Sequence, residues 1–306
     1  MKNVFYYGGQ AVIEGVMMRG KESIAVSVYR PDGTLSIWRQ KIPGIYKGRI
    51  RNIPFIRGIF VLIESMVLGI KSLFYSAEVA SFGDEEKIPP IAIAGVVILS
   101  LAFAVGLFFI SPLLIARVLD AYITSDLLSN VIEGIIRITI FVLYLVAIRQ
   151  FPDVKRIYRY HGAEHKVINA YEAGRELLID EIKPYPTAHT RCGTSFIFVV
   201  MAITILVFAI VGRPSIFISI VSRIALLPVI AAIGYEITRL GARYCTNPLA
   251  KILLAPGLLL QSLTTMEPDD NQIKAAVSSL KEVIVADGHQ VITESDQSVS
   301  SGSSAL

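Results

Sequence analysis

A run of about 26 residues without a single charge, 91–116, constrains the fold more than any other feature of this 306-residue chain. Crossing the hydrocarbon of a bilayer takes about 20 apolar residues in a helix. Three further runs, 127–148, 195–211 and 215–238, are similarly apolar, although an arginine and a proline interrupt the last. Only 18% of the residues are charged, whereas soluble domains carry about 25%. We therefore predict a polytopic α-helical membrane protein with about four transmembrane helices.

The charges in the connecting segments predict the orientation of these spans. The connection 119–126 carries no Lys or Arg and 212–214 carries one, whereas the segment 149–193 is rich in both. Basic loops stay on the cytoplasmic side. We therefore expect a multi-pass protein of the cell inner (plasma) membrane, with both termini and the segment 149–193 in the cytoplasm.

The net charge of +4 fits this topology and does not indicate nucleic-acid binding. No basic stripe with interleaved aromatic residues occurs in the sequence, so no nucleic-acid partner is predicted. The partners that we expect are the lipid bilayer and a membrane or cytosolic protein.

The first 50 residues alternate in the manner of β-strands, and we predict that 1–50 form a small β-rich cytosolic cap. The runs 23–30 and 34–40 are β-rich and are joined by Pro-Asp-Gly, a turn sequence. Residues 10–18 are apolar on both faces, which predicts one strand covered on both sides.

The rest of the chain divides into a membrane domain, 51–266, and a C-terminal part. Residues 52–78 carry Arg, Glu and Lys at seven-residue spacing, which favours an amphipathic helix on the membrane surface. The short apolar run 249–263 contains Pro-Gly and is expected to be interfacial or re-entrant. Capping-box spacing before residue 267 predicts a cytosolic helix at 267–286. The serine-rich segment 287–306 is expected to be a disordered tail.

Two of the chain's four histidines lie in the string His161-Gly-Ala-Glu164-His165, which has the H-x-x-E-H pattern of zinc hydrolases. The surrounding residues recur at helical spacing between a Pro-Asp start and a Gly stop, so we predict a helix over 152–174. On a helix, His161 and His165 lie one turn apart and can share one metal ion. Glu164 is rotated off this line, where a general base would act on bound water.

A tetrahedral zinc site needs more ligands, and three residues are candidates. His189 and Cys192 have H-x-x-C spacing and follow the helix histidines after a loop of about 23 residues, as in known zinc sites. The chain's other cysteine, Cys245, forms no disulfide framework with Cys192, and both are expected on the reducing side. Glu236, at the cytosolic end of the fourth span, is the third candidate, since acidic residues at membrane depth are functional by default.

The number of ligands separates two kinds of site. If His189 and Cys192 both bind, the tetrahedron is closed and the metal is structural. If one of the three candidates binds, a position stays open for water. We favour the open site with His189 as the third ligand.

Metal-free alternatives account for the same residues. Buried histidines can instead hydrogen-bond to Glu14, Glu236 or backbone carbonyls at an interface between the cap and the membrane domain. Among other charged residues, Glu133 and Arg137 have i, i+4 spacing and are expected to neutralise each other.

Four segments together make the chain resemble the bacterial YqhQ family, membrane proteins without an assigned activity that are sometimes labelled predicted metal-dependent enzymes. These segments are 8–19, 160–172, 189–195 and 247–270. The resemblance covers nearly the whole chain except the tail. It implies a membrane location and a metal, and it supplies no substrate or reaction.

Two functions from different classes follow. The first is a hydrolase at the cytosolic face that uses zinc, or another divalent transition metal, with Glu164 as base, on a peptide or a lipid-linked substrate. The second is a non-enzymatic membrane assembly or scaffold factor in which the metal is structural or absent.

Overall fold

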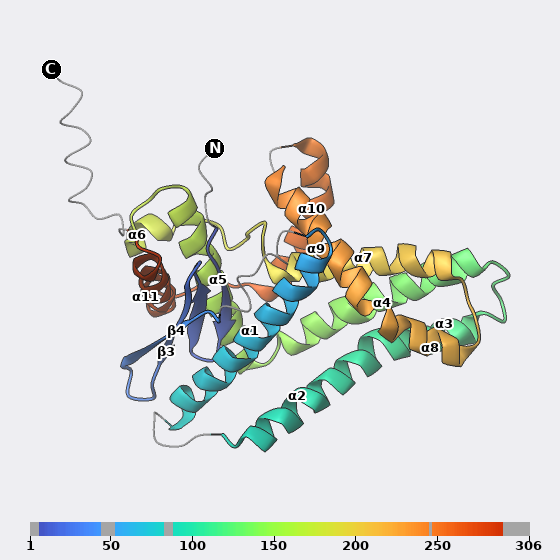
Figure 1. Ribbon diagram of the computed structural model, residues 1–306, viewed down its shortest axis with the longest axis horizontal. Coiled ribbons are helices and arrows are strands. Elements are labelled where there is room, and N and C mark those ends of the chain that lie inside the picture. Colours follow the sequence, from blue (N-terminus) through green and yellow to red (C-terminus); the bar gives the residue numbers. More distant parts are fainter. Residues whose placement is uncertain (1–5, 44–52, 83–87, 245–246, 290–306) are drawn as a thin grey trace.

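The computed structural model describes residues 6–43, 53–82, 88–244 and 247–289. The predicted tail from 290 onwards and Cys245 lie outside these ranges. The described part is mostly helical, with one N-terminal antiparallel sheet. In Figure 1 the sheet lies at one end of the molecule with α5 (Pro152–Glu172) and α11 (Asp270–Ala286), and apolar helices extend from it to the other end.

The sheet has four strands in the order β1-β2-β3-β4, each antiparallel to the next. Their bounds are β1 Gly8–Val12, β2 Gly15–Arg19, β3 Ser23–Tyr29 and β4 Leu35–Lys41. The last two strands agree with the predicted runs 23–30 and 34–40. The prediction of a single strand over 10–18 is wrong, because the chain turns back at Ile13-Glu14. Glu14 has φ 54°, a left-handed conformation that is uncommon outside glycine.

Helices cover both faces of this sheet, which explains why strands β1 and β2 are apolar on both sides. Helix α1 (Ile56–Phe82) packs on one face, where Leu68 and Val79 join a buried cluster with strand residues. Helices α5 and α11 pack on the other face around a larger cluster that includes Met18 and Ile273. The sheet is therefore the middle layer of a sandwich (Figure 1).

Four helical segments in the described residues are long and apolar enough to cross a membrane. They are Ile56–Ser81 within α1, Pro90–Leu119, Asp126–Ile148 (α4) and Gly193–Val211 (α7). The second comprises α2 (Pro90–Val105), a π-helical stretch η3 (Gly106–Ile110) and α3 (Ser111–Leu119). Three of the four predicted spans thus coincide with such helices. The predicted span 215–238 corresponds to α8 (Ile216–Ala225) and α9 (Leu227–Arg243), which qualify only as a pair bent by 45°.

Helix α1 differs from the other three because it is tied to the sheet along its length. The Arg19 guanidinium binds the buried Glu64 carboxylate at 2.8 Å, and the Ile13 N–H donates to Ser76 Oγ at 3.1 Å. A helix that covers a sheet in this way presents only one side to its surroundings. Because this helix is also long and apolar enough to cross a membrane, the amphipathic surface helix expected at 52–78 stays a prediction.

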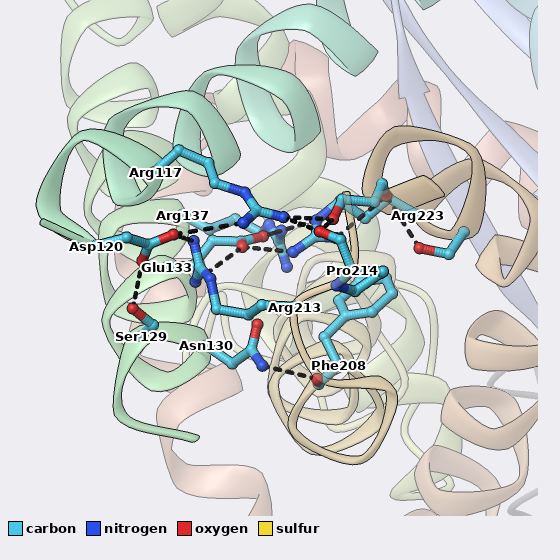
Figure 2. Close-up of polar contacts among 12 residues, drawn as sticks. Arg117, Asp120, Ser129, Asn130, Glu133, Arg137, Phe208, Arg213, Pro214 and Arg223 are labelled. Atoms are coloured by element: carbon cyan, nitrogen blue, oxygen red, sulfur yellow. Dashed lines mark hydrogen bonds and ion pairs between the residues drawn. The ribbon is translucent and has the colours of Figure 1, made fainter. Parts of the chain in front are cut away.

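A buried ionic cluster joins helices of the apolar bundle, as Figure 2 shows. Glu133 on α4 binds Arg137 at 2.8 Å on the same helix, as its i, i+4 spacing predicts. Arg223 on α8 also binds Glu133, with contacts of 2.9 and 2.5 Å. All three side chains are at most 3% exposed. The cluster therefore fixes α8 against α4 inside an otherwise apolar bundle.

The C-terminal helix begins later than the sequence predicts. Asp269 is the N-cap of α11, and it forms a reciprocal capping box with Gln272. The predicted start at 267 lies before Pro268, and a residue that precedes proline is disfavoured in the helical conformation. After the helix, the Asp287 carboxylate accepts hydrogen bonds from the N–H groups of Lys21 and Glu22. The first residue of the predicted tail thus contacts the cap.

Candidate metal centre

Helix α5 carries the two central histidines side by side. It begins at Pro152, which suits the first helical position because proline lacks an N–H, and Asp153 follows in the first turn. His161 and His165 lie one turn apart, and their ring centroids are 4.4 Å apart. His165 is 1% exposed and His161 is half-buried. The predicted helix over 152–174 is therefore confirmed, and it ends at Glu172.

Cys192 completes the cluster from a distant part of the chain. Its Sγ lies 3.3 Å from His161 Nε2, and the ligand atoms of His161, His165 and Cys192 all lie within 4.8 Å of one another. Cys192 is the N-cap of α7, and its sulfur accepts a hydrogen bond from the Thr194 N–H at 3.4 Å. Donation from a helix N-terminus suits a negatively charged sulfur ligand.

The backbone fixes the tautomer of both histidines. His161 Nδ1 donates to the carbonyl of Thr264 at 2.8 Å, and His165 Nδ1 donates to the carbonyl of Thr187 at 2.5 Å. Each ring therefore keeps a lone pair on Nε2. Metal-bound histidines in proteins typically have such a second hydrogen bond. The carbonyl contacts expected in the metal-free alternative are thus present, and they use only one nitrogen of each ring.

Glu164 lies beside the cluster, with its carboxylate 3.5 Å from His165 Nε2. It is 4% exposed and packs against Gly9 of β1, where a Cβ would come within 2.7 Å of its Cγ. A cavity of about 210 Å³ adjoins both histidines, Glu164 and Cys192. A small polar group in this cavity would meet the three ligand atoms and a carboxylate together.

The other two candidate ligands lie outside this group. The Nε2 of His189 is 3.6 Å from a carboxylate oxygen of Glu172, and its ring centroid is 5.6 Å from that of His165. Burial lowers the pKa of His189, against the opposing effect of Glu164, and so favours the neutral ring. Glu236 binds Arg57 at 2.7 Å and accepts from the Phe55 N–H. The structure therefore differs from our preference for His189, since it brings Cys192 to the two histidines.

Sequence reasoning missed two residues that hold the chain in place around the candidate site. Gln261 of α10 (Pro248–Thr264) is fully buried, and its amide binds both main-chain groups of His189 and the Ser195 hydroxyl. Gly162 packs directly on the carbonyl of Met266. A buried glutamine in an apolar run was the one available signal for Gln261, because such a residue needs partners.

Comparison with known proteins identifies the family. The family described as "Protein of unknown function (DUF1385)" matches residues 53–286. The chain belongs to this family. It is also 32% identical over 294 residues to the "Uncharacterized protein YqhQ" of Bacillus subtilis (strain 168), and the match covers 91% of this chain and 92% of that protein. The resemblance indicated by the sequence motifs is thus confirmed. No solved structure matches the chain.

Proposed function

We propose that this protein is a multi-pass protein of the bacterial inner membrane that binds a divalent transition metal, preferably zinc, at its cytosolic face. It uses the metal to hydrolyse a peptide or a lipid-linked substrate. His161, His165 and Cys192 are the protein ligands, and Glu164 is the general base. One observation carries the proposal: two Nε2 atoms with fixed lone pairs converge on a cysteine sulfur beside a buried carboxylate.

The membrane placement rests on apolar helices and on the charges of their connections. The 149–193 segment contains eight Lys and Arg residues, whereas 119–126 contains none. Arg213, in the other short connection, lies beside Asp120 at 2.9 Å, so an acid compensates its charge. These short connections lie at the end of the bundle opposite the sheet (Figure 1). The positive-inside rule therefore puts the sheet and α5 in the cytoplasm, with α1 on the membrane surface.

Three protein ligands leave the fourth tetrahedral position open, which is the arrangement of catalytic zinc sites. The metal would polarise the substrate carbonyl or phosphoryl oxygen and lower the pKa of bound water. Glu164 would take a proton from the attacking water. For a peptide, the new C–O bond replaces the C–N bond, and Glu164 passes the proton to the leaving amine. Burial of Glu164 keeps bulk water from competing for this proton.

Measurement of metal content and hydrolysis on one preparation tests the proposal. Full-length protein in detergent should contain about one zinc ion per chain and should cleave fluorescein-labelled casein or phospholipid vesicles. Glu164→Gln should keep the metal and lose at least about 100-fold in rate, as expected for a general base. Glu181→Gln, an exposed acid beyond the same helix, is the matched control. Metal-free wild-type protein would refute the proposal. Unchanged hydrolysis by Glu164→Gln would show that Glu164 is not the general base.

A further inference from the structure

The cavity beside the candidate ligands opens onto the edge of the sheet. Strand β1 is outermost in the strand order, and within the described ranges no other strand pairs with its free side. Residues 7–10 line the cavity together with His161, Glu164 and Cys192. The main chain of an edge strand and the candidate metal ligands therefore share one space, which we call the edge groove.

The hydrogen-bond phase of the sheet determines which groups of β1 point into this groove. The N–H of Tyr29 donates to the carbonyl of Glu14 at 2.9 Å, just before β2 begins. Hydrogen bonding alternates along an antiparallel strand, so Val16 and every second residue after it in β2 bond to β3. The remaining residues of β2 bond to Gly8 and every second residue after it. The N–H and C=O groups of Gly9 and Ala11 therefore point away from the sheet.

Within the residues that the structure describes, this edge lacks the features that normally prevent another chain from adding to it. Proteins blunt exposed edges with charged side chains, prolines or a covering element. Strand β1 reads Gly-Gly-Gln-Ala-Val and has no charge or proline. Leu68 of α1 and Ile168 of α5 also line the cavity, so helices from the two outer layers flank the free edge. The edge groove is thus lined by strand residues and by one helix from each outer layer.

We propose that an extended polypeptide segment adds to the free edge of β1 and that this pairing presents one of its peptide carbonyls to the metal and Glu164. The inference rests on the proposed hydrolytic site and narrows its substrate to a polypeptide. An added strand would lie about 4.8 Å from β1 and would satisfy its outward N–H and C=O groups. A lipid headgroup has no such alternating row of donors and acceptors.

Removal of one outward N–H tests the pairing directly. Ala11→Pro deletes a donor at the free edge, a position where a sheet tolerates proline. Gly9 is less suitable because any side chain there meets Glu164. Ile37→Pro is the matched control, because Ile37 lies on β4, the opposite edge strand of the sheet. The same alternation of hydrogen bonds directs the Ile37 N–H away from the sheet, and Ile37 is 45% exposed. Both variants are made in full-length Glu164→Gln protein, which binds without turnover.

Fluorescence anisotropy with fluorescein-labelled casein, a disordered polypeptide, measures the affinity. We expect Ala11→Pro to weaken binding five- to tenfold, as for one lost hydrogen bond, and Ile37→Pro to leave it unchanged. A second measurement uses protein without the proline substitutions and two competitor decapeptides of one sequence, plain and N-methylated at every residue. The methylated peptide should compete at least tenfold more weakly, because it cannot donate to β1.

The outcomes separate this inference from the proposed function. Equal competition by the two decapeptides would overturn the inference, and so would equal affinities of the two proline variants. Zinc-loaded protein that cleaves phospholipid vesicles and does not bind casein would also overturn it and leave the metal site intact. Casein binding through the β1 edge by protein that contains no metal would refute the proposed hydrolase alone.

Discussion

The Nε2 atom of His161 lies 3.3 Å from the sulfur of Cys192, although 31 residues separate them in the chain. His161 is on α5, at the end of the molecule that holds the sheet, and Cys192 begins α7, an apolar helix of the bundle. The candidate ligands therefore join the layer that contains the sheet to the apolar helix bundle at one point. A metal bound there would connect the two.

Exchange of Cys192 for Ser should remove the metal. The zinc–thiolate bond is lost, and two histidines alone bind zinc weakly. The zinc content should therefore fall from about one ion per chain to less than about a tenth of an ion per chain. His189→Gln should retain the metal, because its Nε2 lies toward Glu172. Plasma mass spectrometry of both purified variants checks this. Metal retained in Cys192→Ser and lost in His189→Gln would restore His189 as the third ligand.

The topology prediction concerns the ends of the spans. Alkaline phosphatase is active only outside the cytoplasm, so fusions after residues 123 and 213 should be active. Fusions after 175 and 285 should be inactive, and green fluorescent protein at those two positions should fluoresce. The reverse pattern would move the histidines outside and would contradict a site that depends on a reduced Cys192.

Local patterns in the sequence predicted the elements that carry the site. The 3.6-residue recurrence over 152–174 is a property of one segment, and α5 forms there. The turn Pro-Asp-Gly likewise predicted the hairpin of β3 and β4, and Gly33 adopts φ 81° in it. Each of these signals depends on residues that are neighbours in the chain, so sequence alone contains it.

The completion of the site could not be predicted in the same way. The choice of Cys192 over His189 depends on how the loop after α5 returns to α7, and the spacing H-x-x-C is the same in either case. The groups that orient the histidines are carbonyls of Thr187 and Thr264, and every residue has a carbonyl. Hydrogen bonds to main-chain carbonyls do not depend on residue type, so the sequence does not reveal which distant segments form them.

Neutralisation of Glu133 should destabilise the bundle strongly. In Glu133→Gln, Arg137 and Arg223 keep their charges, and both are buried with their carboxylate partner gone. Breaking a buried ion pair costs about 3–5 kcal/mol. Thermal unfolding in detergent should therefore show a much lower midpoint than wild type. Asp126→Asn, in the exposed first turn of the same helix, should change it little. Equal midpoints would show that the cluster contributes little to stability.

The last prediction concerns Gly162, which follows the candidate ligand His161 on α5. Gly162 packs against the segment that follows α10. A Cβ at this position would lie 2.0 Å from the carbonyl oxygen of Met266. That segment is held by the Met266 N–H, which donates to the Tyr158 carbonyl at 2.9 Å, and by the carbonyl of Thr264, which accepts from His161. Gly162→Ala must therefore push this segment away from α5 and weaken the contact that orients His161.

We expect two separate effects in this variant. Overpacking should lower the free energy of unfolding by about 1–3 kcal/mol. Loss of the orienting hydrogen bond should weaken zinc affinity about 10- to 100-fold, the usual effect of removing a second hydrogen bond from a histidine ligand. Gly95→Ala, in α2 where nothing lies within 4 Å of the new methyl group, is the control. Chelator competition on folded protein measures affinity independently of stability. If Gly162→Ala binds zinc as tightly as Gly95→Ala, the Thr264 carbonyl does not position His161 for the metal.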